Sequence, residues 1–410
     1  MKTAKVSFLN HQGTKLMANI ELPDDRKPGS FALFAHCFTC NKNFTAMHNI
    51  SKALTAAGFG VLRFDFTGLG QSEGDFADTN FSGNIQDLKS AAAFMEKEYS
   101  APALLVGHSL GGAAVLYAAA ELKSVGAVAT IAAPADPKHV KQLITSDLEE
   151  IEKQGYANVS IGGRPFTIKK QFIDDLEAVE LNKILQNLGK ALLIAHAPQD
   201  TIVGIDNAGI IFKNARHPKS FISLDGADHL LANEADSRYI GTVIAHWAKR
   251  YIDFAQVENP DTDLQLVASL SKSDKFTTLI KAGKHQLVGD EPEKYGGNDF
   301  GPSPYDFVSA GLASCTAMTI KMYADRKKWE LEEVVVHIKH QKIHAEDCKT
   351  CENSTESKID QFNRFIELKG SLEEEQVRKL MEIADKCPVH KTLRSEIDIQ
   401  TTLKDSEPND

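Results

Sequence analysis

The chain has 410 residues, which at roughly 150 residues per domain indicates two or three domains and excludes a single small binding module. Hydrophobic residues make up 42% and charged residues 25%, ordinary values that leave enough apolar side chains for two separate cores. Lys and Arg total 46 against 56 Asp and Glu, and the net charge of -10, without basic blocks, argues against nucleic acid or an anionic membrane surface as a partner.

We find no targeting or membrane-spanning pattern in the sequence. The first ten residues contain no continuous apolar core and no small-residue cleavage site, so we expect no signal peptide. The longest uncharged stretch, 101–120, is interrupted by Gly107, His108 and Ser109 and fails as a membrane-spanning helix. Six cysteines are too few for a disulfide scaffold, and this sparse usage predicts a cytoplasmic protein.

Residues 1–257 alternate short apolar runs with amphipathic helical patterns. Apolar runs of this length suit strands buried on both faces of a parallel sheet, so the alternation predicts a doubly wound α/β domain. The runs are 31–35, 60–64, 103–106, 127–131 and 191–195, and the helical patterns are 48–57, 83–98, 111–122 and 236–254. The alternation lapses over about 135–190, a charged and mostly helical stretch that we interpret as a small cap above the ligand-binding edge of the sheet. An ordinary helical excursion is the alternative.

A polar, Pro-containing linker at 256–263 separates this domain from a second one over 264–405. The second pattern is α+β, with runs of strands and two long helices. Strands are predicted at 265–271, 276–287, 334–343, 359–368 and 395–403, and helices at 304–326 and 372–386, with a Gly- and Pro-rich loop at 290–303.

A serine in the first domain has the surroundings of a nucleophile. Gly107-His-Ser109-Leu-Gly111 follows an apolar strand directly and precedes an Ala-rich helix. A nucleophile on such a sharp turn needs small neighbours two residues away on each side, so that strand and helix can pack. The turn would expose the Ser109 hydroxyl at a helix N-terminus, whose partial positive charge favours a developing anion.

A serine hydroxyl is a weak nucleophile unless a base accepts its proton, so a histidine and an orienting carboxylate should follow in the chain. Asp200 lies in the loop after a late strand, and His229 lies in a Gly-containing loop before the last helix of the domain. The order Ser109, Asp200, His229 is the one expected for this topology. Asp228 as the orienting carboxylate and His196 as the base are the competing candidates.

These residues resemble those of the α/β-hydrolase superfamily, over roughly residues 15–255. The segment 63–72 resembles the Asp-x-Arg-Gly-x-Gly-x-Ser turn of its serine aminopeptidase-like and lysophospholipase-like members, with Thr67 in place of the Arg. The resemblance implies an oxyanion hole made by two backbone N–H groups. Leu110 would supply one and Phe38 the other, although Cys37 stands where the family has Gly.

Cys37 and Cys40 also form a C-x-x-C pair. Redox use of such a pair would need a thioredoxin-like context. Because the pair falls in the expected oxyanion loop, we interpret these cysteines as packing residues.

Two cysteines in the second domain fall on apolar helix faces. The residues Val308, Leu312, Cys315, Thr319 and Met322 follow steps of four and three, which predicts that Cys315 lies on a buried stripe. Cys387 continues the apolar face of the later helix and stands at its end, directly before Pro388. Either cysteine alone would be interpreted as an ordinary core residue.

The surrounding segments, 296–304, 310–316 and 387–393, closely resemble the OsmC/Ohr family of osmotically inducible and organic hydroperoxide resistance proteins, over roughly 265–405. The resemblance implies a homodimer in which a Cys315 thiolate attacks a hydroperoxide, Cys387 condenses with the sulfenic acid, and external thiols reduce the disulfide. The family's Glu is replaced by Tyr305, next to Asp306. Upstream, where the family has an Arg, only Lys281 and Lys284 are available.

Five further residues could suggest zinc: His337, His340, His344, Cys348 and Cys351. No second C-x-x-C lies nearby, and strand alternation puts His337 and His340 on opposite faces. We therefore predict a polar hairpin loop, and neither a metal nor another cofactor.

The motifs together predict a serine hydrolase of esters, thioesters or amides, fused to a dimerising thiol domain that reduces organic hydroperoxides. The expected ligands are a small acyl substrate, an organic hydroperoxide and an external thiol reductant. Two alternatives stay open: an antioxidant thiol peroxidase with a degenerate hydrolase domain, and a hydrolase whose second domain only dimerises.

Overall fold

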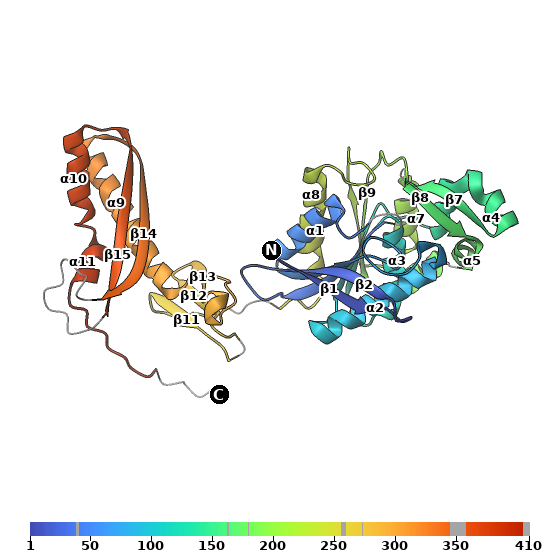
Figure 1. The fold of residues 1–410 in the computed structure, drawn as a ribbon, viewed down its shortest axis with the longest axis horizontal. Coiled ribbons are helices and arrows are strands. Elements are labelled where there is room, and N and C mark those ends of the chain that lie inside the picture. The colour runs from blue at the N-terminus through green and yellow to red at the C-terminus, as the bar shows by residue number, and fades with distance from the viewer. Residues whose placement is uncertain are drawn as a thin grey trace. The chain divides into compact units, whose positions relative to one another are not determined.

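The computed structural model describes residues 1–37, 41–161, 164–178, 180–255, 260–272, 274–344 and 358–404. The chain divides into two compact units, Met1–Glu258 and Asn259–Asp410 (Figure 1). No helix among the described residues is both long enough and apolar enough to cross a membrane.

An eight-stranded sheet, ordered β1-β2-β4-β3-β5-β6-β9-β10, forms the centre of the first unit. The first three strands in this order pair antiparallel, and the remaining pairs are parallel. The strands are β1 (Lys2–Leu9), β2 (Lys15–Leu22), β3 (Ser30–Ala35), β4 (Phe59–Phe64), β5 (Leu104–His108), β6 (Ala127–Ile131), β9 (Ala191–His196) and β10 (Lys219–Ser223). All five strands predicted for this unit are present, whereas β1, β2 and β10 were not predicted.

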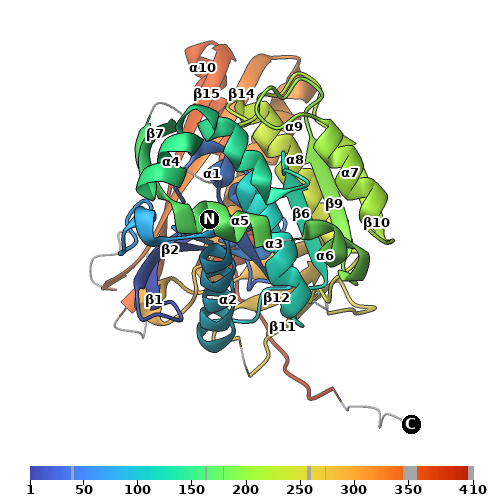
Figure 2. The ribbon, with the colours of Figure 1, turned by 90° about the vertical axis from the view of Figure 1, so that its right-hand side faces the viewer.

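Helices cover both faces of this sheet and create two hydrophobic cores. One core joins the sheet to α2 (Phe81–Glu98) and α3 (Leu110–Glu121). The other joins it to α1 (Thr45–Ala56) and α8 (Glu234–Ala248). Helix α3 packs beside β6, and α7 (Asp206–Asn214) lies beside β9 and β10 (Figure 2). Strands β3, β5, β6 and β9 are almost completely buried because both of their faces are covered.

The cap stretch contains a β-hairpin as well as helices, so the mostly helical prediction is wrong in part. Its elements are a 3₁₀ segment Pro137–Asp147, α4 (Leu148–Gln154), β7 (Tyr156–Ile161), β8 (Arg164–Lys169), α5 (Lys170–Ala178) and α6 (Leu181–Asn187). Strands β7 and β8 pair antiparallel. Ala157 and Val159 are buried at alternating positions, which is the period of a strand and not of a helix.

The described residues of the second unit form two antiparallel sheets and three α-helices. Its elements are β11 (Leu266–Ser269), β12 (Thr278–Ala282), β13 (His285–Gly289), α9 (Pro304–Lys327), β14 (Glu330–His344), β15 (Lys358–Ser371), α10 (Glu374–Ala384) and α11 (Pro388–Arg394). Helix α9 begins where Ser303 and Asp306 form a capping box, with Pro304 at the first helical position. The described core of buried residues is small: Ile320, Ala324, Leu380 and Ala384.

Three predictions for the second unit differ from the structure. The segment 276–287, predicted as one strand, forms the antiparallel strands β12 and β13, with a turn at Gly283 between them. Helix α9 buries Leu312, Thr316, Ile320 and Ala324, which follow steps of four, whereas Val308 and Met322 are 39% and 72% exposed. The apolar residues of α9 itself are spread over several of its faces. The periodicity of the sequence alone therefore could not identify the face that is buried. The last predicted strand, 395–403, is not a strand, and Ile399 and Leu403 there are exposed.

Candidate functional site

Ser109 occupies a strained turn between β5 and α3. Its backbone has φ 54° and ψ −126°, a combination that a non-glycine residue rarely adopts. A Cβ on Gly107 would lie 2.4 Å from the Gly111 carbonyl oxygen, and one on Gly111 would lie 2.3 Å from the His36 carbonyl oxygen. The Ser109 amide donates to the Ile131 carbonyl of β6 at 2.8 Å. The glycines therefore permit the close packing that keeps the turn sharp.

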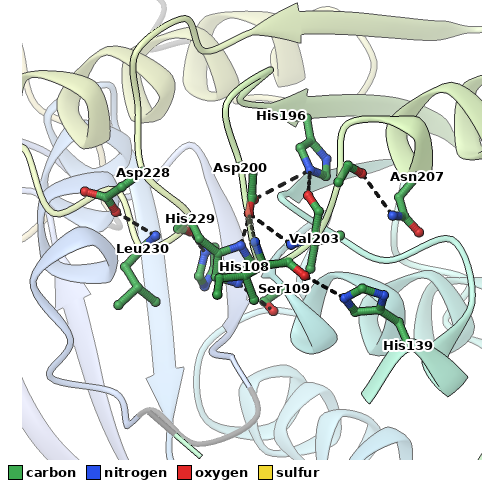
Figure 3. Close-up of polar contacts among 12 residues, drawn as sticks. His108, Ser109, His139, His196, Asp200, Val203, Asn207, Asp228, His229 and Leu230 are labelled. Carbon is green, nitrogen blue, oxygen red and sulfur yellow. Dashed lines mark hydrogen bonds and ion pairs between the residues drawn. The ribbon is translucent and has the colours of Figure 1, made fainter. Parts of the chain in front are cut away.

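Ser109, His229 and Asp200 lie in hydrogen-bond contact in that order (Figure 3). His229 Nε2 is 3.1 Å from Ser109 Oγ, and His229 Nδ1 is 2.7 Å from Asp200 Oδ2. Asp200 follows β9, and His229 stands in the loop between β10 and α8. Because a carboxylate only accepts, the N–H of a neutral imidazole lies on Nδ1, which leaves Nε2 as the acceptor facing the serine hydroxyl.

The Asp200 carboxylate is held in its charged form. Burial raises its pKa, but hydrogen bonds from His229 and from the backbone N–H groups of Val203 and Ile202 outweigh burial and lower the pKa below its usual value. The two N–H groups lie 2.9 and 2.8 Å from Asp200 Oδ1. The charged carboxylate therefore stands in a fixed orientation toward His229.

The two competing candidates, Asp228 and His196, form hydrogen bonds with other residues. Asp228 is exposed, and its carboxylate accepts the backbone N–H groups of Leu230 at 2.8 Å and Ala232 at 3.2 Å. His196 is buried, and its Nε2 donates to the Val203 carbonyl at 2.7 Å. The burial of His196 lowers its pKa and favours the neutral ring. Neither residue contacts Ser109 in the hydrogen bonds of the described residues.

Of the two expected oxyanion donors, one can be placed. Leu110 is the first residue of α3, where backbone N–H groups have no partner within the helix. Phe38 and Cys40 lie outside the described residues. His36 Nδ1 donates to the Cys37 carbonyl at 2.7 Å, and Cys37 takes part in a disulfide bond. Cys37 is buried, as expected of a packing residue, but its disulfide bond was not predicted from the sequence.

Two residues after Cys40, Lys42 belongs to a buried ion pair that the sequence did not reveal. Lys42 and Asp65 are each 1% exposed and form an ion pair. The Lys42 backbone N–H also donates to Asp65 Oδ1 at 2.6 Å, and its carbonyl accepts from Arg63. Arg63 in turn pairs with the buried Glu21 of β2. These bonds connect residue 42 to the turn after β4.

His108 is another residue of the site that the sequence analysis missed. Its Nε2 donates to the His229 carbonyl at 2.7 Å. Burial of the ring, followed by the nearby His229, lowers the pKa of His108 to about 4. The only signal in the sequence is its place between Gly107 and Ser109.

In the second unit, Cys315 and Cys387 are free thiols, and their side chains are hydrogen-bonded to each other. Cys387 is completely buried and Cys315 is half-buried. Cys387 Sγ accepts the His390 backbone N–H at 3.4 Å. Burial raises the pKa of Cys387, but the bonds from His390, Cys315 and Thr316 lower it more, which favours the thiolate.

A cation contacts Thr316, which is hydrogen-bonded to Cys387, from a strand that follows Cys315 in sequence. Arg364 of β15 donates to Thr316 Oγ1 at 2.9 Å and to the Ala384 carbonyl at 3.0 Å, and it pairs with Asp385 at 2.6 Å. An open cavity of about 740 Å³ lies beside it. Apolar and charged residues line this cavity together, including Leu312, Phe362, Ile366, Met381 and His390. Nothing in the local sequence around Arg364 marks it as part of the site.

Two histidines of the β14–β15 hairpin have carboxylate partners. His337 lies 3.2 Å from Glu367, and His340 lies 2.8 Å from Asp360. Cys348, Cys351 and the side chain of His344 lie outside the described residues. Among the residues that are described, no group of three or more His, Cys, Asp or Glu side chains could hold a metal ion.

Comparisons with known proteins match each unit to a different family. The family model for serine aminopeptidase, S33, matches residues 39–154, and the model for OsmC-like proteins matches residues 296–402. The solved esterase domain of a Rhodothermus marinus protein is 50% identical over 61% of this chain and 99% of that chain, with a TM-score of 0.52.

A curated relative, mitochondrial palmitoyl-protein thioesterase ABHD10 of Mus musculus, is 31% identical over 134 residues, which are 32% of this chain. The match spans 43% of that relative's length. The structure of mouse alpha/beta hydrolase domain-containing protein 10 is 21% identical over 60% of this chain and 99% of that chain, with a TM-score of 0.52, and it shows the fold alone.

The first unit belongs to the α/β-hydrolases, a class of enzymes, and the fold class predicted from the sequence is confirmed. The second unit is an OsmC-like domain. The chain is therefore an α/β-hydrolase followed by an OsmC-like domain.

Proposed function

We propose that the first unit hydrolyses an ester, thioester or amide through an acyl-enzyme on Ser109. The observation that carries this proposal is the hydrogen-bonded series from Ser109 through His229 to a charged Asp200. The intact series also argues against a degenerate hydrolase domain. The relatives named esterase and palmitoyl-protein thioesterase support an acyl ester or thioester as the substrate class.

The proposed reaction begins when Ser109 Oγ attacks the acyl carbonyl carbon and His229 Nε2 accepts the hydroxyl proton. The carbonyl oxygen becomes an oxyanion that accepts from the Leu110 and Phe38 backbone N–H groups. His229 then returns the proton to the leaving alcohol, thiol or amine as the acyl-enzyme forms. Water attacks the acyl-enzyme with His229 again as base, which releases the acid and restores Ser109. Asp200 keeps the Nδ1–H tautomer and stabilises the imidazolium.

The second unit is proposed to reduce organic hydroperoxides as a dimer. A Cys315 thiolate would attack the O–O bond, giving a sulfenic acid and, after protonation, an alcohol. Cys387 would then displace water to form a disulfide, which two equivalents of an external thiol reduce. The contact between the two thiols supports this proposal, as does the bond from Arg364 to Thr316, the residue after Cys315. Exposed Met318 and Met322 on α9 support a second copy as its partner.

Fluorophosphonate labelling and a panel of p-nitrophenyl esters test the hydrolase. We expect Ser109→Ala to abolish labelling and hydrolysis, and persistence of either in this variant would remove the serine mechanism.

A cumene hydroperoxide assay with Cys387→Ser tests the thiols, since peroxide turnover without Cys387 would exclude its resolving role. Cell fractionation tests the cytoplasmic placement, which is still a prediction from the cysteine usage.

A further inference from the structure

His108 connects the strand that carries the nucleophile to the loop that carries the base. It is the last residue of β5 and directly precedes Ser109. Its Nε2 donates to the backbone carbonyl of His229 at 2.7 Å, and Figure 3 shows both histidines beside Ser109. One side-chain hydrogen bond therefore joins two segments that are 121 residues apart.

The ring of His108 is held in one protonation state and one place. It is 4% exposed, and its centroid lies 5.2 Å from that of His229 and 6.3 Å from that of Phe44. With its pKa near 4, the His108 ring is neutral at neutral pH. A neutral ring has a single N–H, and the bond to the His229 carbonyl requires it on Nε2.

The other ring nitrogen shows that packing alone does not explain a histidine here. His108 Nδ1 is buried, and no hydrogen-bond partner for it is found in the described part of the chain. A buried acceptor without a partner is costly, and a phenyl ring would occupy similar space without that cost. What histidine adds over a phenyl ring is the Nε2–H bond to the loop of the base.

We propose that His108 is a positioning residue for the hydrolase reaction: its bond to the His229 carbonyl sets the position of the imidazole relative to Ser109 Oγ. The proposal rests on the proposed role of His229 as the base. Loss of the bond would let the loop of His229 shift, and small displacements of a catalytic group reduce the rate strongly. Substrate binding would change little, because His108 is buried and its hydrogen bond goes to the backbone of His229.

The test compares His108→Gln with His108→Asn in the full chain. A Gln side-chain amide reaches about as far as Nε2 and can donate to the His229 carbonyl, whereas an Asn amide is too short. Both variants are polar, so they carry similar costs of burial. We expect kcat for p-nitrophenyl butyrate to fall about 10- to 100-fold in His108→Asn with KM within about threefold of wild type, and His108→Gln to stay within about threefold of wild-type kcat.

The rate constant of fluorophosphonate labelling should follow kcat in both variants, because it reports the same activated hydroxyl. His108→Phe adds a stability readout: it removes the bond and also the unpaired nitrogen, so we expect a slow enzyme without a matching loss of thermal stability. Equal kcat in the Gln and Asn variants, or wild-type kcat in His108→Phe, would overturn the positioning role. Absence of labelling in the wild type would instead refute the proposed function.

Discussion

The first unit holds Ser109, the proposed nucleophile, directly after β5, an interior strand of a sheet that is covered on both faces. The second unit holds its thiols beside a described hydrophobic cluster of four buried residues. Ser109 has the imidazole and the carboxylate of the proposed mechanism in one hydrogen-bonded series within the described part of its own unit. The thiols are also in contact, but α9 beside them exposes large apolar side chains. The hydrogen-bonded series of the first unit thus accompanies large buried cores, whereas the exposed apolar side chains of α9 are where the proposed second copy would bind.

The largest expected effect concerns the charge behind His229. Asp200→Asn should lower kcat about 10⁴-fold, because an amide at this place favours the wrong imidazole tautomer. The backbone bonds from Ile202 and Val203 to Oδ1 can persist, so the fold should be retained. Steady-state hydrolysis measures the effect. Asp228→Asn is the matched control, with less than threefold change expected, and a larger loss in the control than in Asp200→Asn would reverse the assignment.

The next effect tests the buried ion pair of the first unit. Lys42→Met leaves Asp65 buried without its cation, which should reduce the free energy of unfolding of this unit by about 3–5 kcal/mol. Each unit has one Trp, Trp247 in the first and Trp329 in the second, so urea unfolding followed by fluorescence in a Trp329→Phe background reports the first unit.

Lys89→Met is the control for that experiment. Lys89 pairs with Glu121 on the surface, where such pairs contribute about 0–1 kcal/mol. An equal decrease in the free energy of unfolding in both methionine variants would show that the buried ion pair stabilises the first unit no more than a surface ion pair does.

The order of Ser109, Asp200 and His229 could be predicted because the fold fixes where each must stand along the chain. The strands around them are continuous apolar runs, which reveal a covered sheet. Lys42, His108 and Arg364 could not be predicted, because each acts through partners distant in sequence and leaves no local pattern. In α9 the apolar residues suggested one stripe, and packing against β14 and α10 selected another.

A smaller effect follows from His108. Its pKa is near 4 in the folded unit against 6.5 in the unfolded chain, so the unfolded state binds the proton first as the pH falls. The contribution of the neutral His108 ring to the free energy of unfolding is fully present above pH 6.5. It decreases as the pH falls toward 4, by up to about 3 kcal/mol. Urea unfolding of Trp329→Phe with and without His108→Phe isolates the contribution. Equal pH dependence in the two proteins would contradict the neutral buried ring.

The smallest effect concerns the exposed side of the second unit. If a second copy covers α9, Met322→Lys should raise the dissociation constant of the dimer at least about tenfold, because it places a charge in an apolar interface. Sedimentation equilibrium measures this, with Lys321→Gln on the same helix as the control. Ester hydrolysis should stay unchanged. A monomeric wild type would remove the dimer from the proposal.

The central claim is that the Ser109 hydroxyl is activated by His229. Its most direct test is mass-spectrometric location of the fluorophosphonate adduct, with labelling rates for wild type and His229→Gln. The account predicts a single adduct on Ser109 and labelling slowed by about 10³-fold or more without the imidazole. An adduct on another residue, or an unchanged rate in His229→Gln, would contradict it.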